Sequence, residues 1–249
     1  MTREQVLAIA ESILATRYPG SVLAFASGSY FRGEATSTSD LDFIVLFETL
    51  PQAFRESFYW EGLPVEAFVH DPETLASFCW QMDRVEGRPS LPTMILDGVP
   101  LPSATSLAEE LTTMAQAVMA AGPLPLTTEA IQRRRYHLGD LLDDLRAPRS
   151  KAERVAVGTV LYGELADFYL RQKGLYSAVS KWIPRRLAQV DRDFGDRYQA
   201  AFERLFCEGE ATEVEAIAAD ILAPVGGTLF ADYRLDAPPE WRQKGPAGA

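Results

Sequence analysis

The chain has 249 residues, of which 47% are hydrophobic and 24% are charged. This composition is typical of a globular protein with a sizeable core and excludes disordered and fibrous classes, while the length allows one large domain or two smaller ones. The formal net charge is −11. An acidic surface repels phosphate backbones, so a long nucleic-acid ligand is disfavoured, whereas a cationic substrate or a small anion bound with a metal remains compatible.

Cysteine usage and the N-terminus restrict the class of protein further. Cys79 and Cys207 lack CxxC spacing, so we expect buried free thiols rather than a disulfide framework or a zinc site. Charges interrupt the N-terminal segment where a signal peptide is apolar, and no apolar run reaches about 18 residues. We therefore expect a cytoplasmic protein with no membrane partner.

The first hundred residues combine helical and strand-like patterns. Thr2 and Gln5 have the spacing of a capping box and precede apolar residues at helical intervals, which predicts a helix that ends near Tyr18. Short apolar runs and one alternating pattern predict strands. The expected strands cover residues 21–27, 41–47, 63–71 and part of 92–101, with a helix over 73–85 before the last of them.

Beyond Pro102 the strand-like runs stop and helical periodicity takes over. We expect helices over residues 107–118, 131–145, 150–174, 184–205 and 211–222, packed as a bundle. The end of the chain is rich in proline, glycine and charge. The expected domains are 1–102, 103–235 and a flexible tail at 236–249.

Asp40 and Asp42 stand at the start of the apolar run 41–47. Residues two apart on a strand point to the same face, and two such carboxylates repel unless a cation lies between them, which makes Mg²⁺ the natural candidate. After the strand 21–27, Gly28 and Ser29 predict a turn into a short helix whose backbone N–H groups and hydroxyl could bind phosphate. Phosphate at one end and metal at the other outline a nucleoside triphosphate site.

A third carboxylate would complete a two-metal site or supply a general base. Glu66 lies in the middle of the next expected strand and would neighbour the two aspartates if the strands pair. Its rivals, Glu61 and Asp71, fall at the ends of that strand. Either aspartate alone could simply cap a turn before a strand, but the combination with the Gly-Ser pair and Glu66 favours a site.

The stretch GSYFRGEATSTSDLD, residues 28–42, resembles the signature of the DNA polymerase beta-like nucleotidyltransferase superfamily, specifically its small-molecule branch. The resemblance covers about the first 100 residues, and the remainder is similar, more loosely, to the helical domains of aminoglycoside adenylyltransferases. It implies an α+β fold, with a small mixed sheet flanked by helices and a C-terminal all-α helical bundle. The implied catalytic and metal-binding residues are Asp40, Asp42 and Glu66, and the implied nucleotide-binding residues are Gly28, Ser29 and Ser39. Arg32 matches a position with a structural role.

The helical half offers weaker signals. Lys181 precedes an expected helix start, and in related two-domain enzymes a lysine from the helical domain reaches the triphosphate, so we expect Lys181 to bind nucleotide. Trp182 could stack on a ring or simply anchor packing. The Arg133–Arg135 run and nearby acids could form a solvated face of ion pairs or, with Glu164 and Asp167, line a cleft for an amine-bearing acceptor.

Together these patterns predict a magnesium-dependent nucleotidyltransferase with two Mg²⁺ ions, which transfers a nucleoside monophosphate from ATP or another NTP to a hydroxyl of a small molecule. An aminoglycoside-like antibiotic is the leading acceptor, which would make the protein an antibiotic-resistance enzyme. A protein or tRNA acceptor stays open, as does a non-catalytic nucleotide-binding regulator or toxin-antitoxin component.

Overall fold

The structure is a computed structural model that describes residues 1–103 and 105–242. The chain forms two compact units. The first contains Met1–Pro125 together with Lys173–Ser177, and the second contains Leu126–Gln172 and the chain from Ala178 onward. The fold class is α+β, with a mixed sheet in the first unit and helices in the second, as predicted.

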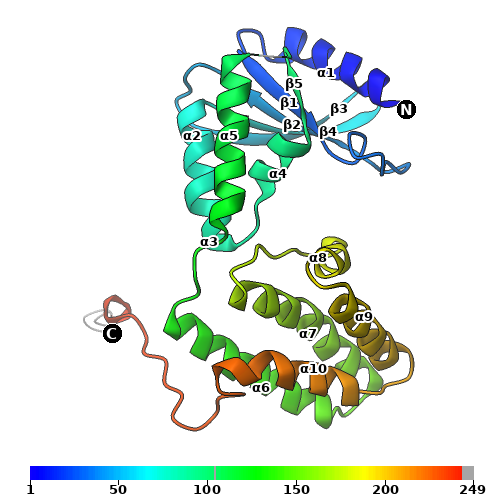
Figure 1. Cartoon of the computed structure of the whole chain (residues 1–249), viewed down its shortest axis with the longest axis vertical. Coiled ribbons are helices and arrows are strands. Elements are labelled where there is room, and N and C mark those ends of the chain that lie inside the picture. The colour runs from blue at the N-terminus through cyan, green and yellow to red at the C-terminus, as the bar shows by residue number, and fades with distance from the viewer. Residues whose placement is uncertain (104, 243–249) are drawn as a thin grey trace, which may run out of the picture. The chain divides into compact units, whose positions relative to one another are not determined.

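The first unit is a five-stranded sheet covered by helices on both faces (Figure 1). The strands are β1 (Leu23–Ser27), β2 (Leu41–Leu46), β3 (Phe54–Trp60), β4 (Leu63–His70) and β5 (Val99–Leu101). The helices are α1 (Arg3–Arg17), α2 (Pro72–Ser77), the π-helical turn η1 (Phe78–Asp83), α3 (Arg84–Glu86), α4 (Ser90–Asp97) and α5 (Ser106–Ala121).

The strands lie in the order β3-β4-β2-β1-β5. Only β2 and β4 are parallel to each other, and the other pairs are antiparallel. As a result, the end of β1 and the starts of β2 and β4 meet at one edge of the sheet. In register, Asp42 stands opposite Ser27 on one side and Glu66 on the other.

Alternation along the strands separates two apolar cores. One face, with Phe43 and Val45, packs against the buried side chains of α1. The opposite face, with Phe25 and Ile44, packs against η1, α4 and α5. Because β2 is buried on both faces, it reads as a continuous apolar run rather than an alternating one.

Several predicted elements of the first unit are confirmed. The capping box of Thr2 and Gln5 opens α1, and β1, β2 and β4 lie where strands were predicted. Two predictions were wrong in part. Residues 90–97 are helical, because Leu91 and Ile95 lie one helical turn apart and pack under the sheet, so only Val99–Leu101 is a strand. The helix predicted over 73–85 is α2, η1 and α3 in succession.

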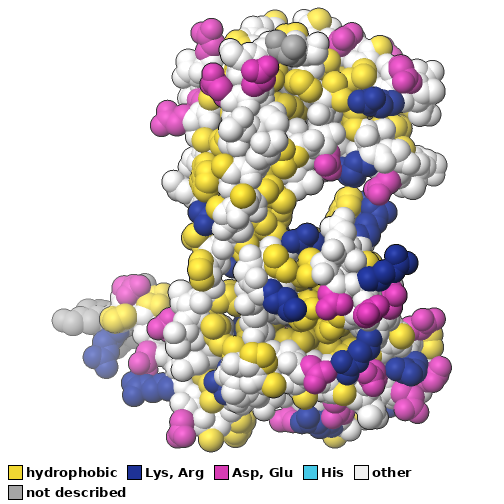
Figure 2. All heavy atoms as spheres, in the orientation of Figure 1, with side chains coloured by type: hydrophobic (Ala, Val, Ile, Leu, Met, Phe, Trp, Pro, Cys, Tyr) yellow, Lys and Arg dark blue, Asp and Glu magenta, His cyan; other side chains and the backbone are white. Residues whose placement is uncertain are grey.

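The second unit is helical. Its elements are α6 (Thr128–Arg146), α7 (Lys151–Gln172), α8 (Trp182–Val190), α9 (Arg192–Cys207), α10 (Thr212–Leu222) and the 3-10 turns η2 (Ala223–Val225) and η3 (Pro239–Trp241). An aromatic core joins α7 and α9, where Tyr169 stacks on Phe194 with ring centroids 3.9 Å apart. On the surface, Figure 2 shows acidic and basic side chains interspersed over this unit, and Arg197 bonds both Glu213 and Asp220.

The helix predicted over 184–205 is two helices. Asp191 has an extended backbone between them and caps α9, since its side chain accepts a hydrogen bond from the Phe194 N–H. Cys79 is buried as expected, but Cys207 is exposed. Within the described residues, no helix is long and apolar enough to cross a membrane.

The two units divide the chain differently from the predicted boundary at residue 102. Helix α5 belongs to the first unit because Leu111, Ala115 and Val118 are buried in the core under the sheet. The short segment Lys173–Ser177 also joins the first unit, where the buried Tyr176 donates a hydrogen bond from its hydroxyl to the Val118 carbonyl. Of the predicted tail, residues 243–249 lie outside the described residues.

Candidate active site

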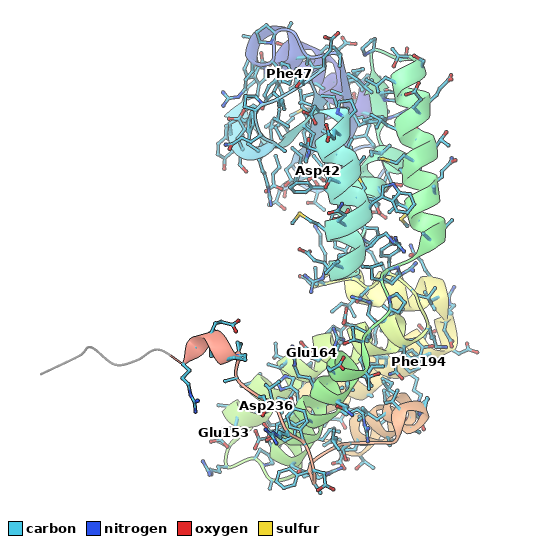
Figure 3. All side chains as sticks on the ribbon, turned by 90° about the vertical axis from the view of Figure 1, so that its left-hand side faces the viewer. Asp42, Phe47, Glu153, Glu164, Phe194 and Asp236 are labelled. Atoms are coloured by element: carbon cyan, nitrogen blue, oxygen red, sulfur yellow. The ribbon has the colours of Figure 1, made fainter. Side chains whose placement is uncertain are left out.

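The acidic triad, which we define as Asp40, Asp42 and Glu66, lies at the sheet edge where β1 ends and β2 and β4 begin. One carboxylate oxygen of each residue lies within 4.8 Å of those of the other two. Asp42 and Glu66 are register partners on parallel strands, so their side chains project from the same face. Figure 3 shows Asp42 and Phe47 at opposite ends of the β2 run. The sequence prediction that these carboxylates converge is confirmed.

Partial burial of Asp42 dominates the electrostatics of the triad, and repulsion from its neighbours comes second. Burial and the negative charges of Asp40 and Glu66 together raise the pKa of Asp42 to about 6, although the positive charges of Arg32 and Arg55 act in the opposite direction. The ionised form of Asp42 is therefore disfavoured when no cation is bound nearby. The three carboxylates therefore form a set that a divalent cation would relieve.

Position 28, beside Asp42, requires a glycine. Its backbone has φ +103°, which side-chain-bearing residues rarely adopt. A Cβ at this position would also lie only 2.9 Å from the Asp42 Oδ2. The glycine thus lets the chain after β1 pass directly over the carboxylate.

The segment after Gly28 is a succession of turns rather than the short helix that we predicted. The Phe31 N–H donates to the Gly28 carbonyl at 3.1 Å, and the Glu34 N–H donates to the Ser29 carbonyl at 2.9 Å. This i to i+5 closure and the left-handed Gly33 (φ +72°) turn the chain back before a helix can continue. A phosphate would meet a looped backbone and hydroxyls here, not a helix N-terminus.

Ser29 and Ser39 lie together although ten residues separate them. The Ser29 hydroxyl donates to the Ser39 Oγ at 2.7 Å, and the Thr36 N–H donates to the same oxygen at 2.8 Å. These bonds tie the turn after β1 to the loop that carries Asp40. Two hydroxyls predicted to bind nucleotide are thereby placed on the Gly28 side of the triad.

Sequence reasoning missed two neighbours of the triad. Arg55 on β3 donates from Nη2 to the Glu66 Oε2 at 2.6 Å, and its guanidinium lies 4.9 Å from the centroid of the Phe68 ring. Ser27, opposite Asp42, is fully buried, and its hydroxyl has no hydrogen-bond partner among the described residues. Arg55 was missed because strand β3 was not predicted. No pattern in the sequence distinguishes Ser27.

Other candidate residues have different roles. Arg32 donates to the Asp97 Oδ2 at 3.3 Å, in keeping with its expected structural role. The rivals of Glu66 are accounted for, because Asp71 caps α2 and Glu61 forms the two-residue turn between β3 and β4 with Gly62.

Several candidate residues belong to the second unit. Lys181 directly precedes α8, with its Nζ 5.9 Å from the Trp182 ring centroid, so its contact with a nucleotide stays a prediction. Arg134 of α6 pairs with Asp167 of α7, so this ion pair joins two helices and differs from the expected pairs within one helix. The role of Glu164 in binding an acceptor also stays a prediction.

The donor set suits a hard cation. Three carboxylates that converge within 4.8 Å are the ligand type that Mg²⁺ prefers, and octahedral Mg²⁺ would keep further positions for water and substrate phosphates. Arg55, whose side chain is 55% exposed, bonds the Glu66 Oε2, so a cation bound by Glu66 would compete with Arg55 for this carboxylate. The residues present therefore fit a divalent cation.

A family model matches the part of the sequence that contains the site. The sequence model of the nucleotidyltransferase domain family matches residues 7–81, which contain the whole acidic triad and the turn after β1. No curated protein matches the chain. Among solved structures, the crystal structure of a nucleotidyltransferase-like protein from Exiguobacterium sibiricum 255-15 is similar at a TM-score of 0.43 and 14% sequence identity, with 88% of this chain and 74% of that chain covered.

Proposed function

We propose that the chain transfers a nucleoside monophosphate from an NTP to a hydroxyl of a small molecule, a proposal supported by the match of residues 7–81 to the nucleotidyltransferase domain model and by the acidic triad within them. ATP is the proposed donor, and Mg²⁺ is the proposed cofactor. Asp40, Asp42 and Glu66 would hold the metal, with two ions as the expected number. When bound, Mg²⁺ neutralises charge on the triphosphate and on the leaving pyrophosphate.

The chain's own residues would position the reaction. Ser29 and Ser39 would donate hydroxyl hydrogen bonds to the β- and γ-phosphates, with Lys181 as a proposed further contact. Glu66 would accept the proton of the acceptor hydroxyl. The acceptor oxygen then bonds to the α-phosphorus as the bond from that phosphorus to the bridging oxygen breaks, and pyrophosphate leaves.

The single observation that carries the proposal is the register of β2 and β4. Asp42 and Glu66 lie side by side at a strand edge, and Gly28 is the only residue type that leaves room for Asp42 to point there. A binding protein could hold a nucleotide with the turn alone. The cost of placing three carboxylates within 4.8 Å favours an enzyme over a non-catalytic regulator.

The acceptor is proposed on weaker grounds. An aminoglycoside-like molecule follows from the arrangement of a nucleotidyltransferase domain before a helical part and from the net charge of −11, which attracts amines. On this proposal the second unit binds the acceptor, and antibiotic resistance is a possible biological outcome. A hydroxyl on a protein or tRNA is the alternative acceptor.

The test combines a nucleotide assay with matched variants. The protein is incubated with labelled ATP, MgCl₂ and a panel of hydroxyl compounds that includes aminoglycosides, and we measure pyrophosphate release and the mass gain of the acceptor. Glu66→Gln should lower the rate by about 10²-fold or more, as expected for loss of a general base and metal ligand. Glu61→Gln, an equally conservative change in the hairpin turn, should not. Equal activity of the two variants would contradict the proposed role of the triad.

A further inference from the structure

A pocket of about 340 Å³ lies in the first unit beside the acidic triad. Its floor is the same face of β4 that carries Glu66, because Phe68 and His70 follow Glu66 at two-residue steps. Arg55 lines the pocket and also bonds Glu66, so it stands where the pocket meets the triad. The opposite wall is η1, with Phe78 and Met82.

Six of the eleven residues that line the pocket are apolar, and the others include Asp83 and Glu86. The rings of Phe68 and Phe78 lie on the pocket side of the sheet, whereas Phe54 stands opposite Val69 and its ring belongs to the other face. Met82 is 47% exposed, so apolar surface of the pocket is open to a ligand. His70 is buried in the lining, and burial lowers its pKa, which leaves a neutral ring for hydrogen bonding. A volume of this size and composition is typical of sites for small organic molecules.

The pocket lies at one end of a row of groups that runs across the sheet from the proposed triphosphate site to Glu66. The turn after β1 carries the hydroxyls for the triphosphate, β2 carries Asp42, β4 carries Glu66, and the pocket lies beyond Glu66 between β4 and β3. The acceptor oxygen must lie near Glu66, on the side away from the leaving pyrophosphate. The body of the acceptor therefore has to extend toward the pocket.

We propose that this pocket binds the apolar, ring-containing part of the acceptor while its hydroxyl reaches Glu66. The inference rests on the proposed nucleotidyl transfer, and it favours acceptors that carry an aromatic or other apolar ring over the aminoglycoside-like acceptor and the second-unit binding site named above. Neighbouring side chains on one strand face are roughly 7 Å apart, so a linker of about two or three carbons connects a ring over Phe68 to a hydroxyl at Glu66. Polycationic sugars without an apolar ring would leave the phenylalanine rings uncovered.

Binding is tested first, on the full chain without nucleotide or metal. The probe is 3-phenyl-1-propanol, observed by saturation-transfer NMR, with kanamycin as the polar contrast. Met82→Trp fills the pocket from η1, and the control Gln81→Trp changes the exposed neighbour of Met82, which does not line the pocket. Ser90→Trp narrows the same pocket from another wall and keeps the test valid if Met82→Trp fails to fold.

The expected result is probe binding to the wild type and to Gln81→Trp, with on the order of tenfold or weaker binding in the pocket-filling variants. In the turnover assay with ATP and MgCl₂, kcat/KM for the phenyl alcohol should fall by a similar factor in those variants. Probe binding that is absent, or that the pocket-filling variants leave unchanged, overturns the proposal. Probe binding in the pocket with no nucleotide transfer to any acceptor refutes the proposed function and with it the acceptor role, so the two failures are distinguishable.

Discussion

Asp42→Asn should stabilise the folded protein at neutral and alkaline pH in the absence of metal. The Asp42 carboxylate is half-buried and shares its place with Asp40 and Glu66, which is why its pKa rises to about 6 from the model-peptide value of 3.8. Asparagine has nearly the same shape and no charge. The substitution therefore removes the repulsion and the desolvation cost of the charge while keeping the packing against Gly28.

The magnitude follows from the size of the shift. A rise from 3.8 to about 6 corresponds to about 3 kcal/mol that the ionised Asp42 costs the folded state. The folded state binds this proton more tightly than the unfolded state, so the wild type loses this stability as pH rises from about 4 to 6 and has the full deficit above 6. For a chain of this length the variant should melt roughly 6–12 °C higher at pH 8.

Differential scanning calorimetry in EDTA measures the effect, with the exposed Glu110→Gln on α5 as a control for loss of one negative charge. The difference between Asp42→Asn and wild type should be large at pH 8 and should vanish near pH 4. Addition of MgCl₂ should raise the melting temperature of the wild type more than that of the variant, which should also be inactive. A variant that is no more stable than wild type at pH 8, or a difference that persists at pH 4, would refute the reasoning.

Three further predictions concern residues of the first unit. Gly28→Ala should lower the free energy of unfolding by about 1–3 kcal/mol in denaturant titration, because a Cβ at φ +103° meets Asp42, and Gly33→Ala, which meets nothing within 4 Å, should cost less. Asp71→Ala should cost about 1–2 kcal/mol in the same measurement, because it removes the α2 cap, and an unchanged value would contradict the capping role. Arg55→Met should bind Mg²⁺ more tightly by calorimetry, because a competing cation leaves the triad, and weaker binding would contradict this.

The triad was predictable because its signals are local. A buried strand on both faces gives a continuous apolar run, so the sequence placed Asp42 at the start of β2, and the alternation around Glu66 gave β4. The sequence argument depended on the two strands being paired, and the structure shows that they pair in parallel with Asp42 opposite Glu66. The same logic could not show that Ser27 is buried without a hydrogen-bond partner, because that depends on packing from several elements.

The pocket beside Glu66 was not predictable from periodicity, for a physical reason. Strand β3 is at the sheet edge, and its alternating exposure of charged and aromatic residues gives no buried run. One signal was available, since Glu61-Gly62 between two strand-length segments is a two-residue turn of the left-handed kind that favours hairpins. The π-helical turn η1 likewise has no periodicity of its own, and these two elements form opposite walls of the pocket.

The free-energy cost of an ionised Asp42 at the start of β2 can be compared with the gain from burying its apolar neighbours. An ionised Asp42 costs the fold about 3 kcal/mol, whereas full burial of one large apolar side chain contributes about 1.5–3 kcal/mol. Phe43, Ile44 and Leu46 are all completely buried in the two cores of the first unit, so about one or two such neighbours offset the cost. Burial of the apolar run therefore contributes enough to hold Asp42 at its position on β2. Less burial, as in Phe43→Ala, should displace the carboxylate before the sheet unfolds.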